Sequence, residues 1–262
     1  MTFVTSGKES NNRFTIFGSD FNFSYFCSTM NDHQEGRCEN CIIRQLNSLK
    51  ALKKDELKRI SDSKTTKTVK KGEAIFKEGE KLNGVYCVRN GVSKLSKMSD
   101  NGKDTIVKIA TKGEVLGQRS VITEEKTNLS AVALNDMEVC YIPKAQLTES
   151  IDNNPHFTKA ILIHMANDLK FADNIIVNMA QKTVKQRVAE ALMYLDENFG
   201  VDDEGYIAIT LTREDIANVV GTAKEACIRT LTLFKKAGWI TTDGKRIRLE
   251  DKKALYNLVE GL

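Results

Sequence analysis

Three changes of pattern along this chain of 262 residues predict an α+β fold. Residues 68 to 142 consist of short β-rich runs separated by glycines, and residues 155 to 181 carry one long helical repeat. Residues 212 to 249 then show two short helical segments followed by a hairpin pattern. Together these patterns predict an antiparallel β-roll or jelly roll, a long helix and a winged helix-turn-helix.

The same changes divide the chain into four segments. They are an N-terminal cysteine-containing segment (1–50), the β-roll (51–150), the long helix (151–182) and the helix-turn-helix domain (183–262). A composition of 41% hydrophobic and 28% charged residues predicts a soluble globular protein with room for two cores. The net charge of +4 is too small to indicate a partner. Residues 1 to 26 show no period and stay unassigned.

The N-terminus has five scattered phenylalanines between residues 14 and 26 but no basic start followed by an apolar run, so we expect no signal peptide. No stretch is long and apolar enough to span a membrane. We therefore expect a cytoplasmic protein without a membrane partner. In that compartment its six cysteines are free, metal-binding or redox-active rather than paired in disulfides.

The cysteines are distributed unevenly. Cys38 and Cys41 form a CxxC in a polar, turn-rich stretch that begins at Cys27. Cys87 lies in an apolar run of the predicted roll, and Cys227 lies in a predicted helix. We interpret Cys87 and Cys227 as buried core residues. The CxxC is by itself a weak metal-site signal.

In the predicted roll, glycines separate runs such as 85–88, 105–109 and 139–142, and Asn101-Gly102 is a hairpin signal. Strands at this spacing form a roll of about a hundred residues. Its interior is either a ligand pocket or filled by its own side chains.

The long helix carries apolar residues at alternating spacings of three and four, the signature of a coiled-coil seam. The stripe is narrow and the helix lies between two domains, so we predict a homodimer interface there. Its residues are Leu162, Met165, Leu169, Ala172, Ile176 and Met179.

The helix-turn-helix pattern rests on local signals. Thr212 with Asp215 three residues later predicts a capped helix that ends at Gly221. Thr222 with Glu225 repeats the signal and predicts the cap of the second helix. Two extended runs joined by Asp243-Gly244 follow, which predicts the β-hairpin of a wing.

Charge indicates that this domain binds DNA. Between Lys224 and Arg248 there are seven basic residues and two acidic ones, an excess suited to phosphate contacts. Side chains early in the second helix can reach base edges in a major groove. The predicted DNA-binding residues are Thr222, Lys224, Glu225, Arg229, Lys245 and Arg246.

The order of β-roll, long helix and winged helix-turn-helix resembles the CRP/FNR family of bacterial transcription regulators. The resemblance covers nearly the whole chain from about Cys38, and it is carried by KKGEAIFKEGEKLNGVYCVRNGVSKL, KGEVLG, VCYIP and TREDIANVVGTAKEACIRTL. It implies a roll of the cyclic-nucleotide-binding type and a homodimer that binds a palindromic promoter site on double-stranded DNA. It also implies that the protein recruits or blocks RNA polymerase.

The resemblance extends to the residues that read DNA. The ExxxR spacing of Glu225 and Arg229 matches the family motif, with Lys224 as a third residue. Arg229 can pair bidentately with guanine, and Glu225 can accept a hydrogen bond from a cytosine amine. Ile228 stands where the FNR branch usually has Ser, so the half-site need not be of the FNR type.

FNR-type oxygen sensors, which the chain resembles most, hold a 4Fe-4S cluster through N-terminal cysteines and one cysteine near the end of the roll. Cys38 and Cys41 fit the N-terminal CxxC, and Cys140 fits the internal ligand. Asn47 occupies the place of the third N-terminal cysteine. Cys27, eleven residues before Cys38, is the expected replacement because a loop of that length closes at small entropic cost. The resemblance thus implies a cluster that oxygen dismantles, controlling dimerisation and promoter binding.

Other cofactors and ligands fit parts of the pattern. Cys27, Cys38 and Cys41 with His33 form a possible zinc site. A small molecule or haem in the roll is a further possibility. Cyclic nucleotide is disfavoured, because Leu129 replaces the arginine with which the family's cyclic-nucleotide branch binds phosphate, and Arg119-Ser120 follows Gly117 too closely to substitute.

We do not expect an enzyme. The sequence lacks a GxxxxGK[ST] phosphate loop, a GxGxxG and an HExxH. Its three histidines leave little scope for acid-base chemistry.

Overall fold

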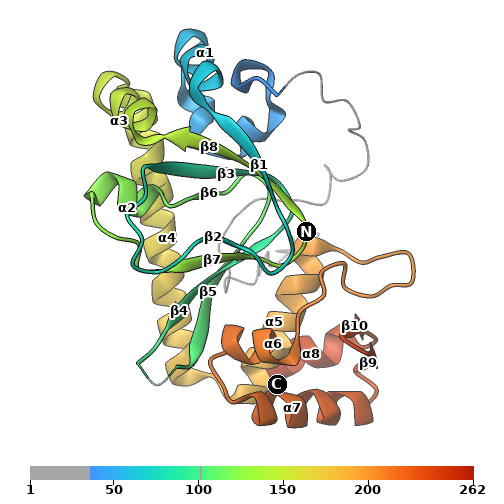
Figure 1. Ribbon diagram of the computed structural model, residues 1–262. Helices are drawn as coiled ribbons and strands as arrows, with labels where there is room; N and C mark the ends of the chain where they lie inside the picture. The colour runs from blue at the N-terminus through green and yellow to red at the C-terminus, as the bar shows by residue number, and fades with distance from the viewer. Residues whose placement is uncertain (1–35, 101) are drawn as a thin grey trace, which may run out of the picture.

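The computed structural model describes residues 36–100 and 102–262, and it has the predicted α+β architecture (Figure 1). The described chain begins with three short 3-10 helices and one α-helix: η2 (Cys38–Asn40), η3 (Ile42–Leu46), η4 (Ser48–Ala51) and α1 (Lys54–Ser63). We refer to residues 36–63 as the N-terminal segment. Cys27 and His33 lie outside the described residues.

The roll consists of two four-stranded sheets with antiparallel pairing throughout. The first contains, in order, β1 (Thr65–Val69), β8 (Met137–Pro143), β3 (Gly84–Asn90) and β6 (Val115–Leu116). The second contains β2 (Ala74–Phe76), β7 (Ser130–Ala133), β4 (Ser93–Met98) and β5 (Asp104–Ala110). Strands β3 and β8 approach so closely at Gly84 that a Cβ there would lie 2.3 Å from the Ile142 carbonyl oxygen.

Helices pack on the roll and connect it to the C-terminal domain. These are α2 (Gln118–Thr123), α3 (Lys144–Asn153) and the long α4 (Pro155–Gln181), which extends from the roll toward the C-terminal domain (Figure 1). The buried Asn154 begins α4, since its Oδ1 accepts hydrogen bonds from the backbone N–H groups of His156 and Phe157. Buried Phe157, Ile161 and Phe171 hold one face of α4 against the rest of the chain.

The C-terminal domain has the predicted winged helix-turn-helix fold. It contains α5 (Val184–Phe199), α6 (Arg213–Val219), α7 (Lys224–Lys236), the hairpin β9 (Ile240–Asp243) and β10 (Arg246–Leu249), and α8 (Lys252–Glu260). Thr212 caps α6 in a reciprocal pair with Asp215, as predicted. The core of the C-terminal domain includes the fully buried Phe234, Ile240 and Leu255.

Two local predictions in this domain were wrong. The N-cap residue of α7 is Ala223, not Thr222, and no side chain caps the helix. Thr222 is buried, and its backbone N–H donates to the Ala217 carbonyl, so it belongs to the turn rather than to the cap. In the wing, Asp243 pairs with Arg246 at the end of the strands, which leaves Gly244 and Lys245 as the turn.

An ion pair joins the roll to the helix-turn-helix. Lys94 on β4 donates to an Asp215 carboxylate oxygen at 2.7 Å, and both side chains are largely buried. Val92, Ile106 and Ile109 of the roll belong to the same apolar cluster as the core of the C-terminal domain. Asp215 therefore serves both the α6 cap and the contact between domains.

This double role predicts unequal mutational costs. Asp215→Ala is expected to lower the free energy of unfolding by roughly 2–3 kcal/mol, because it removes the carboxylate half of the α6 capping box and leaves Lys94 without its buried partner. Lys94→Ala should cost less, since Asp215 keeps its cap, and Lys97→Ala should change stability by less than about 0.5 kcal/mol, because its pair with Glu78 is exposed. Urea unfolding measures all three. Equal losses for Asp215→Ala and Lys97→Ala would contradict the assignment.

Within residues 36–100 and 102–262, no helix is long and apolar enough to cross a membrane.

Candidate functional site

The outer face of α7 carries the side chains predicted to read DNA. Lys224, Glu225 and Arg229 are all exposed, while Cys227, Leu231 and Phe234 hold the opposite face in the core. Lys224 makes an exposed ion pair with Glu214 at 3.2 Å. Within the described part of the chain, no hydrogen bond or ion pair engages Glu225 or Arg229. These two side chains can therefore bind an incoming base edge without breaking an internal contact.

Two of the basic residues of the wing, Lys245 and Arg246, are in different situations. Lys245 lies exposed in the turn. Arg246 makes ion pairs with Asp202 at 2.8 Å and with Glu204 at 3.1 Å, and its guanidinium stacks on the Tyr206 ring, 4.1 Å from the centroid. The Glu204 and Asp202 hydrogen bonds raise the pKa of Arg246 further. Arg246 thus supports the wing from within, and Lys245 is the wing cation available to a phosphate.

The helix-turn-helix and wing are joined by Arg213. Its guanidinium donates to the carbonyl oxygens of Gly244 at 3.0 Å and Lys245 at 3.3 Å. Burial lowers the pKa of Arg213. The contact fixes the wing turn relative to α6.

The predicted seam of α4 lies on the surface of the single chain. Leu162, Leu169 and Ile176 are 63%, 64% and 66% exposed, and they follow one another at seven-residue spacing. Ala172 and Met179 are also exposed, whereas Met165 packs partly against the roll core. Large apolar side chains in an exposed row are a typical sign of a protein interface.

A second candidate site lies where the N-terminal segment covers the β1-β8-β3-β6 sheet. Cys87 on β3 is directly opposite Cys140 on β8 in the antiparallel register, so both side chains project from the same face. Both are buried. Buried Cys38 of η2 belongs to the same apolar cluster, and Cys41 packs against it. All four are free thiols.

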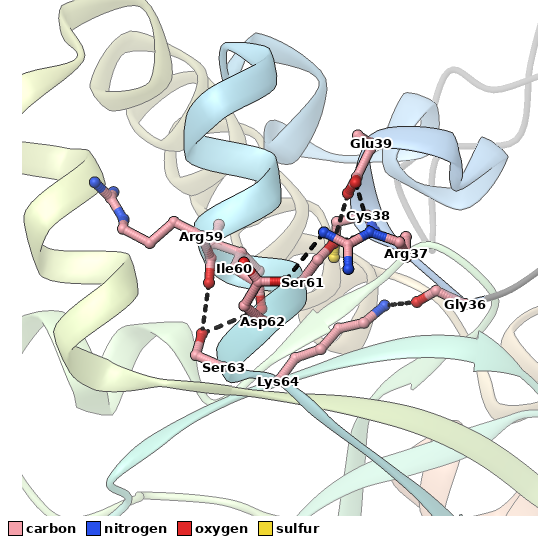
Figure 2. A network of polar contacts seen from close by, with 10 residues as sticks. All are labelled: Gly36, Arg37, Cys38, Glu39, Arg59, Ile60, Ser61, Asp62, Ser63 and Lys64. Atoms are coloured by element: carbon pink, nitrogen blue, oxygen red, sulfur yellow. Dashed lines mark hydrogen bonds and ion pairs between the residues drawn. The ribbon is translucent and has the colours of Figure 1, made fainter.

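Polar contacts attach the cysteine-bearing turn to α1 (Figure 2). The Cys38 backbone N–H donates to Ser61 Oγ at 2.5 Å, and Ser61 Oγ donates to Glu39 at 2.7 Å. Glu39 also pairs with Arg37 at 2.6 Å, and the Arg37 and Ser61 hydrogen bonds lower the pKa of Glu39 to about 2. Lys64 donates to the Gly36 carbonyl oxygen (Figure 2). The turn that carries Cys38 is therefore held by α1 independently of its thiol.

Asn47 links the N-terminal segment to the sheet. Its Nδ2 lies 3.5 Å from Cys87 Sγ and donates to the Gly113 carbonyl oxygen at 3.0 Å. Its Oδ1 accepts from the Leu49 backbone N–H and caps η4. The side chain at position 47 thus reaches the sulfur of Cys87.

The electrostatic surroundings of these thiols are coupled. Burial, followed by the nearby thiols of Cys140, Cys41 and Cys38, raises the pKa of Cys87 to about 12. Burial likewise raises the pKa of Cys140, against the opposing effects of Lys64, the Thr66 hydroxyl and Arg89. Burial thus disfavours the ionised form of Cys87 and of Cys140, whereas Lys64 and Arg89 favour the ionised form of Cys140.

Among the described residues, no three His, Cys, Asp or Glu side chains are arranged to hold a single metal ion. A mononuclear site needs its ligands gathered around one centre, whereas a four-iron cluster binds each thiolate to a different iron at its periphery. The predicted zinc site depends on Cys27 and His33, which lie outside the described residues.

The roll also contains a cavity of about 370 Å³, bounded on one side by α4. Buried Gln118 and Ser120 contribute polar groups to its lining, and Phe171 and Ile175 contribute apolar ones. Leu129 lines it too, at the position that lacks the phosphate-binding arginine.

Two domain families match the chain. The Cyclic nucleotide-binding domain matches residues 66–154, and the Crp-like helix-turn-helix domain matches residues 186–258. The chain belongs to the CRP/FNR family of transcription regulators. The Crp-like helix-turn-helix indicates that this regulator binds DNA, and members of the family are dimeric regulators rather than enzymes.

Curated relatives include several proteins named as regulators. The Anaerobic regulatory protein of Haemophilus influenzae is 29% identical over 226 residues, covering 84% of this chain and 87% of that protein. The Fumarate and nitrate reduction regulatory protein of Escherichia coli K12 is 27% identical, covering 84% of this chain and 89% of that protein. The Transcriptional activator protein Anr of Pseudomonas protegens is also 27% identical, covering 87% and 95% respectively.

Solved structures of the family share the fold. FixK2 from Bradyrhizobium japonicum has a TM-score of 0.66 and 25% identity, covering 74% of this chain and 96% of that chain. A transcriptional regulator of the family from Eubacterium rectale has a TM-score of 0.70 at 22% identity, covering 80% and 96% respectively.

The sequence interpretation of Cys87 was incomplete. Its burial agrees with the predicted core position, but the apolar run around it gave no sign of its alignment with Cys140. Only the strand register, which joins residues more than fifty positions apart, reveals the pair. Asn47 was likewise identified as the site of a missing ligand, without any indication that its side chain contacts Cys87.

Proposed function

We propose that this protein is a redox-responsive, dimeric transcription regulator that holds a 4Fe-4S cluster at the N-terminal segment. The observation that carries the proposal is the convergence of Cys38 and Cys41 with Cys140 beneath that segment. The names of the relatives, which include an anaerobic regulatory protein, support the same reading.

The residues present fit such a cluster in type and surroundings. Thiolates are its usual protein ligands, and its bound form carries net negative charge. Lys64 and Arg89 both act electrostatically on Cys140, so positive charge is already close to the site. When bound, the cluster would supply an oxygen-labile redox centre. Three thiolates come from Cys38, Cys41 and Cys140, and the sequence offers Cys27 as a fourth.

The N-terminal segment also contacts the start of the dimer helix. Asn154 Nδ2 donates to the Ala51 carbonyl oxygen at 3.3 Å and to Glu56 at 2.8 Å, while its Oδ1 caps α4. One side chain therefore connects the cysteine-bearing segment to the first turn of α4. A change in how that segment sits on the roll alters the contacts that position α4, which is the route by which we expect redox state to control dimerisation.

We propose that α4 forms the homodimer interface through its exposed stripe, with Leu162, Leu169 and Ile176 along the centre. In a dimer, two α7 helices approach successive major grooves about one helical turn apart, which requires a palindromic site. Arg229 and Glu225 would then read bases, while Lys245 contacts phosphate. RNA polymerase is the expected further partner at promoters.

The experiment that tests this function is purification without oxygen, followed by iron and sulfide analysis and an absorption spectrum. A cluster should give about four irons and four sulfides per chain and broad thiolate-to-iron absorption. Admission of air should bleach the absorption and weaken promoter binding together. A sharp Soret band would identify haem instead, and protein without iron or sulfide would remove the iron-sulfur proposal.

Base reading predicts a specific effect of one substitution. Arg229→Ala is expected to weaken binding to the cognate site by roughly 1–3 kcal/mol, because one bidentate base contact is lost. Binding to a site with that guanine changed should be affected much less. Competition binding with the two DNAs measures this, and an unchanged preference between them would show that Arg229 does not read a base.

The wing predicts a different kind of loss. Lys245→Ala should weaken binding to all sequences about equally and reduce the slope of log K against log salt by about one, because one phosphate contact is removed. Titrations at several salt concentrations measure the slope. The matched control is Lys253→Ala, because Lys253 is an exposed lysine at the start of α8. Arg248→Ala is unsuitable, since Arg248 is paired with Glu250 and lies over the Tyr206 ring. A shallower slope for the Lys253 variant alone would contradict the assignment.

A second candidate function is ligand gating through the roll cavity. The observation that favours it is the cavity itself, which buried Gln118 and Ser120 line and α4 closes. A molecule bound there would contact the dimer helix directly at Phe171 and Ile175. Native mass spectrometry of the iron-free protein distinguishes this function, because a retained organic molecule would support it.

A further inference from the structure

The fourth ligand that the sequence suggests for the proposed cluster, Cys27, lies outside the described residues. Cys38, Cys41 and Cys140 supply three thiolates, and Cys27 was assigned as the fourth only from loop length. Two further cysteines lie in the described chain. Cys87 belongs to the same apolar cluster as Cys38 and Cys140, whereas Cys227 belongs to the core of the C-terminal domain.

We infer that Cys87 is the fourth thiolate ligand of this site, and that Asn47 positions its sulfur. The inference rests on the proposed function. It assigns a ligand role to Cys87, which the apolar sequence around it identifies only as a buried core residue.

The register of the sheet is the first argument. Cys87 pairs with Cys140 and its neighbours pair in step, Tyr86 with Tyr141 and Val88 with Val139. Because side chains alternate between the faces of a strand, Cys87 and Cys140 project together on one face. Any metal centre that binds Cys140 from that face lies within reach of Cys87.

The cover of that face is the second argument. Cys38 and Cys41 arrive on the N-terminal segment, which contacts the sheet through Asn47 and Cys87 at 3.5 Å. Cys38 belongs to the same buried cluster as the strand cysteines. The four thiols are therefore contributed from two sides, two by the rigid sheet and two by the overlying turn.

Asn47 provides the third argument. Its Nδ2 points at Cys87 Sγ while Gly113 and the η4 cap fix the rest of the side chain. An N–H group directed at a ligand sulfur is one of the means by which proteins stabilise a bound thiolate and adjust the potential of a cluster. Asn47 thus has a defined role as a positioning residue, although its amide is itself a poor iron ligand.

The chemistry of the step balances simply. The S–H bond of Cys87 breaks as its sulfur forms a bond to iron, and the proton passes to water. No oxidant or reductant is needed for ligation itself. The iron and sulfide must be supplied as they are for the proposed function.

The test compares anaerobically reconstituted full-length variants by iron and sulfide content and by absorption. Cys87→Ala is expected to lose most of its iron, like Cys140→Ser, whereas Cys27→Ser and Cys227→Ser keep a full cluster. Circular dichroism checks that each variant is folded. A full cluster in Cys87→Ala overturns the inference, and a Cys27→Ser variant that alone loses iron returns the fourth position to Cys27 while leaving the proposed function intact.

A rescue experiment separates ligation from packing. Because the side chain at 47 touches Cys87 Sγ, a cysteine there can deliver a thiolate to nearly the same place. The double variant Asn47→Cys/Cys87→Ala should regain iron and sulfide, which a purely structural role of Cys87 would not allow. Failure of the folded double variant to regain a cluster counts against the inference. Asn47→Ala alone should keep iron but shift the reduction potential of the cluster, and an unchanged potential would remove the role assigned to Asn47.

Wild-type protein without iron or sulfide is a separate outcome. That result would contradict the proposed function, and the assignment of Cys87 as a ligand would fall with it. If wild type and Cys87→Ala instead contain equal amounts of iron and sulfide, only the assignment of Cys87 is overturned.

Discussion

Cys140→Ser protein prepared without oxygen is expected to contain little iron and to bind its promoter at least about tenfold more weakly than wild type. Among the proposed ligands we expect the site to depend most on Cys140, because it is buried in a strand of the sheet and lies near thiols of two other elements. Without it the proposed cluster would lose the bond that links the N-terminal segment to β8. A tenfold change corresponds to about 1.4 kcal/mol, a modest bias for a cofactor that fixes a segment. Iron analysis and fluorescence anisotropy on promoter DNA measure the two effects.

The matched control is Cys227→Ser. Cys227 is as buried as Cys140, but it lies in α7 and packs in the core of the C-terminal domain. Burial raises the pKa of Cys227 to about 11, with Arg213 opposing, and no other cysteine of the described chain acts on it. The control variant should therefore keep its iron even if its stability falls. A loss of iron in both variants would point to general unfolding rather than to loss of a ligand.

The architecture could be predicted because its signals are local. The repeat along α4 depends on residues three and four apart, and the cap of α6 depends on Thr212 and Asp215, so each pattern is complete within a few turns of chain. The cap of α7 failed for a related reason. Thr222 and Glu225 satisfy the same pattern, but the Ala217 carbonyl binds the Thr222 backbone and the helix begins one residue later.

The candidate sites were less predictable because they depend on distant residues. Arg246 looks like a phosphate-binding side chain in sequence, yet its carboxylate partners Asp202 and Glu204 lie 44 and 42 positions away. The Cys87 and Cys140 pair depends on strand register, and the Asn47 contact depends on how the N-terminal segment crosses the sheet. None of these can be read from local spacing. Sequence thus identifies the residue types of the sites, and tertiary structure decides which of them act together.

The seam of α4 predicts a second large effect. Leu169→Glu is expected to weaken dimerisation by at least about a hundredfold, equivalent to roughly 3 kcal/mol, because a dimer would bury two unpaired carboxylates beside each other near its axis. Leu169 is 64% exposed in the single chain, so the substitution should leave the fold of the monomer almost unchanged. Sedimentation equilibrium measures the dimerisation constant, and circular dichroism checks the fold.

A control on the same helix separates the effect of the added charge from the effect of its position in the stripe. Asn167→Glu introduces an identical side chain two residues earlier, at an exposed position that a helix of 3.6 residues per turn directs away from the stripe. Its dimerisation constant should stay within about threefold of wild type. Because two half-sites must be occupied together for tight binding, the Leu169 variant should also lose affinity for the full palindrome while keeping its affinity for a single half-site. If Leu169→Glu remains a dimer with unchanged palindrome binding, the subunits associate through another surface and α4 does not form the interface.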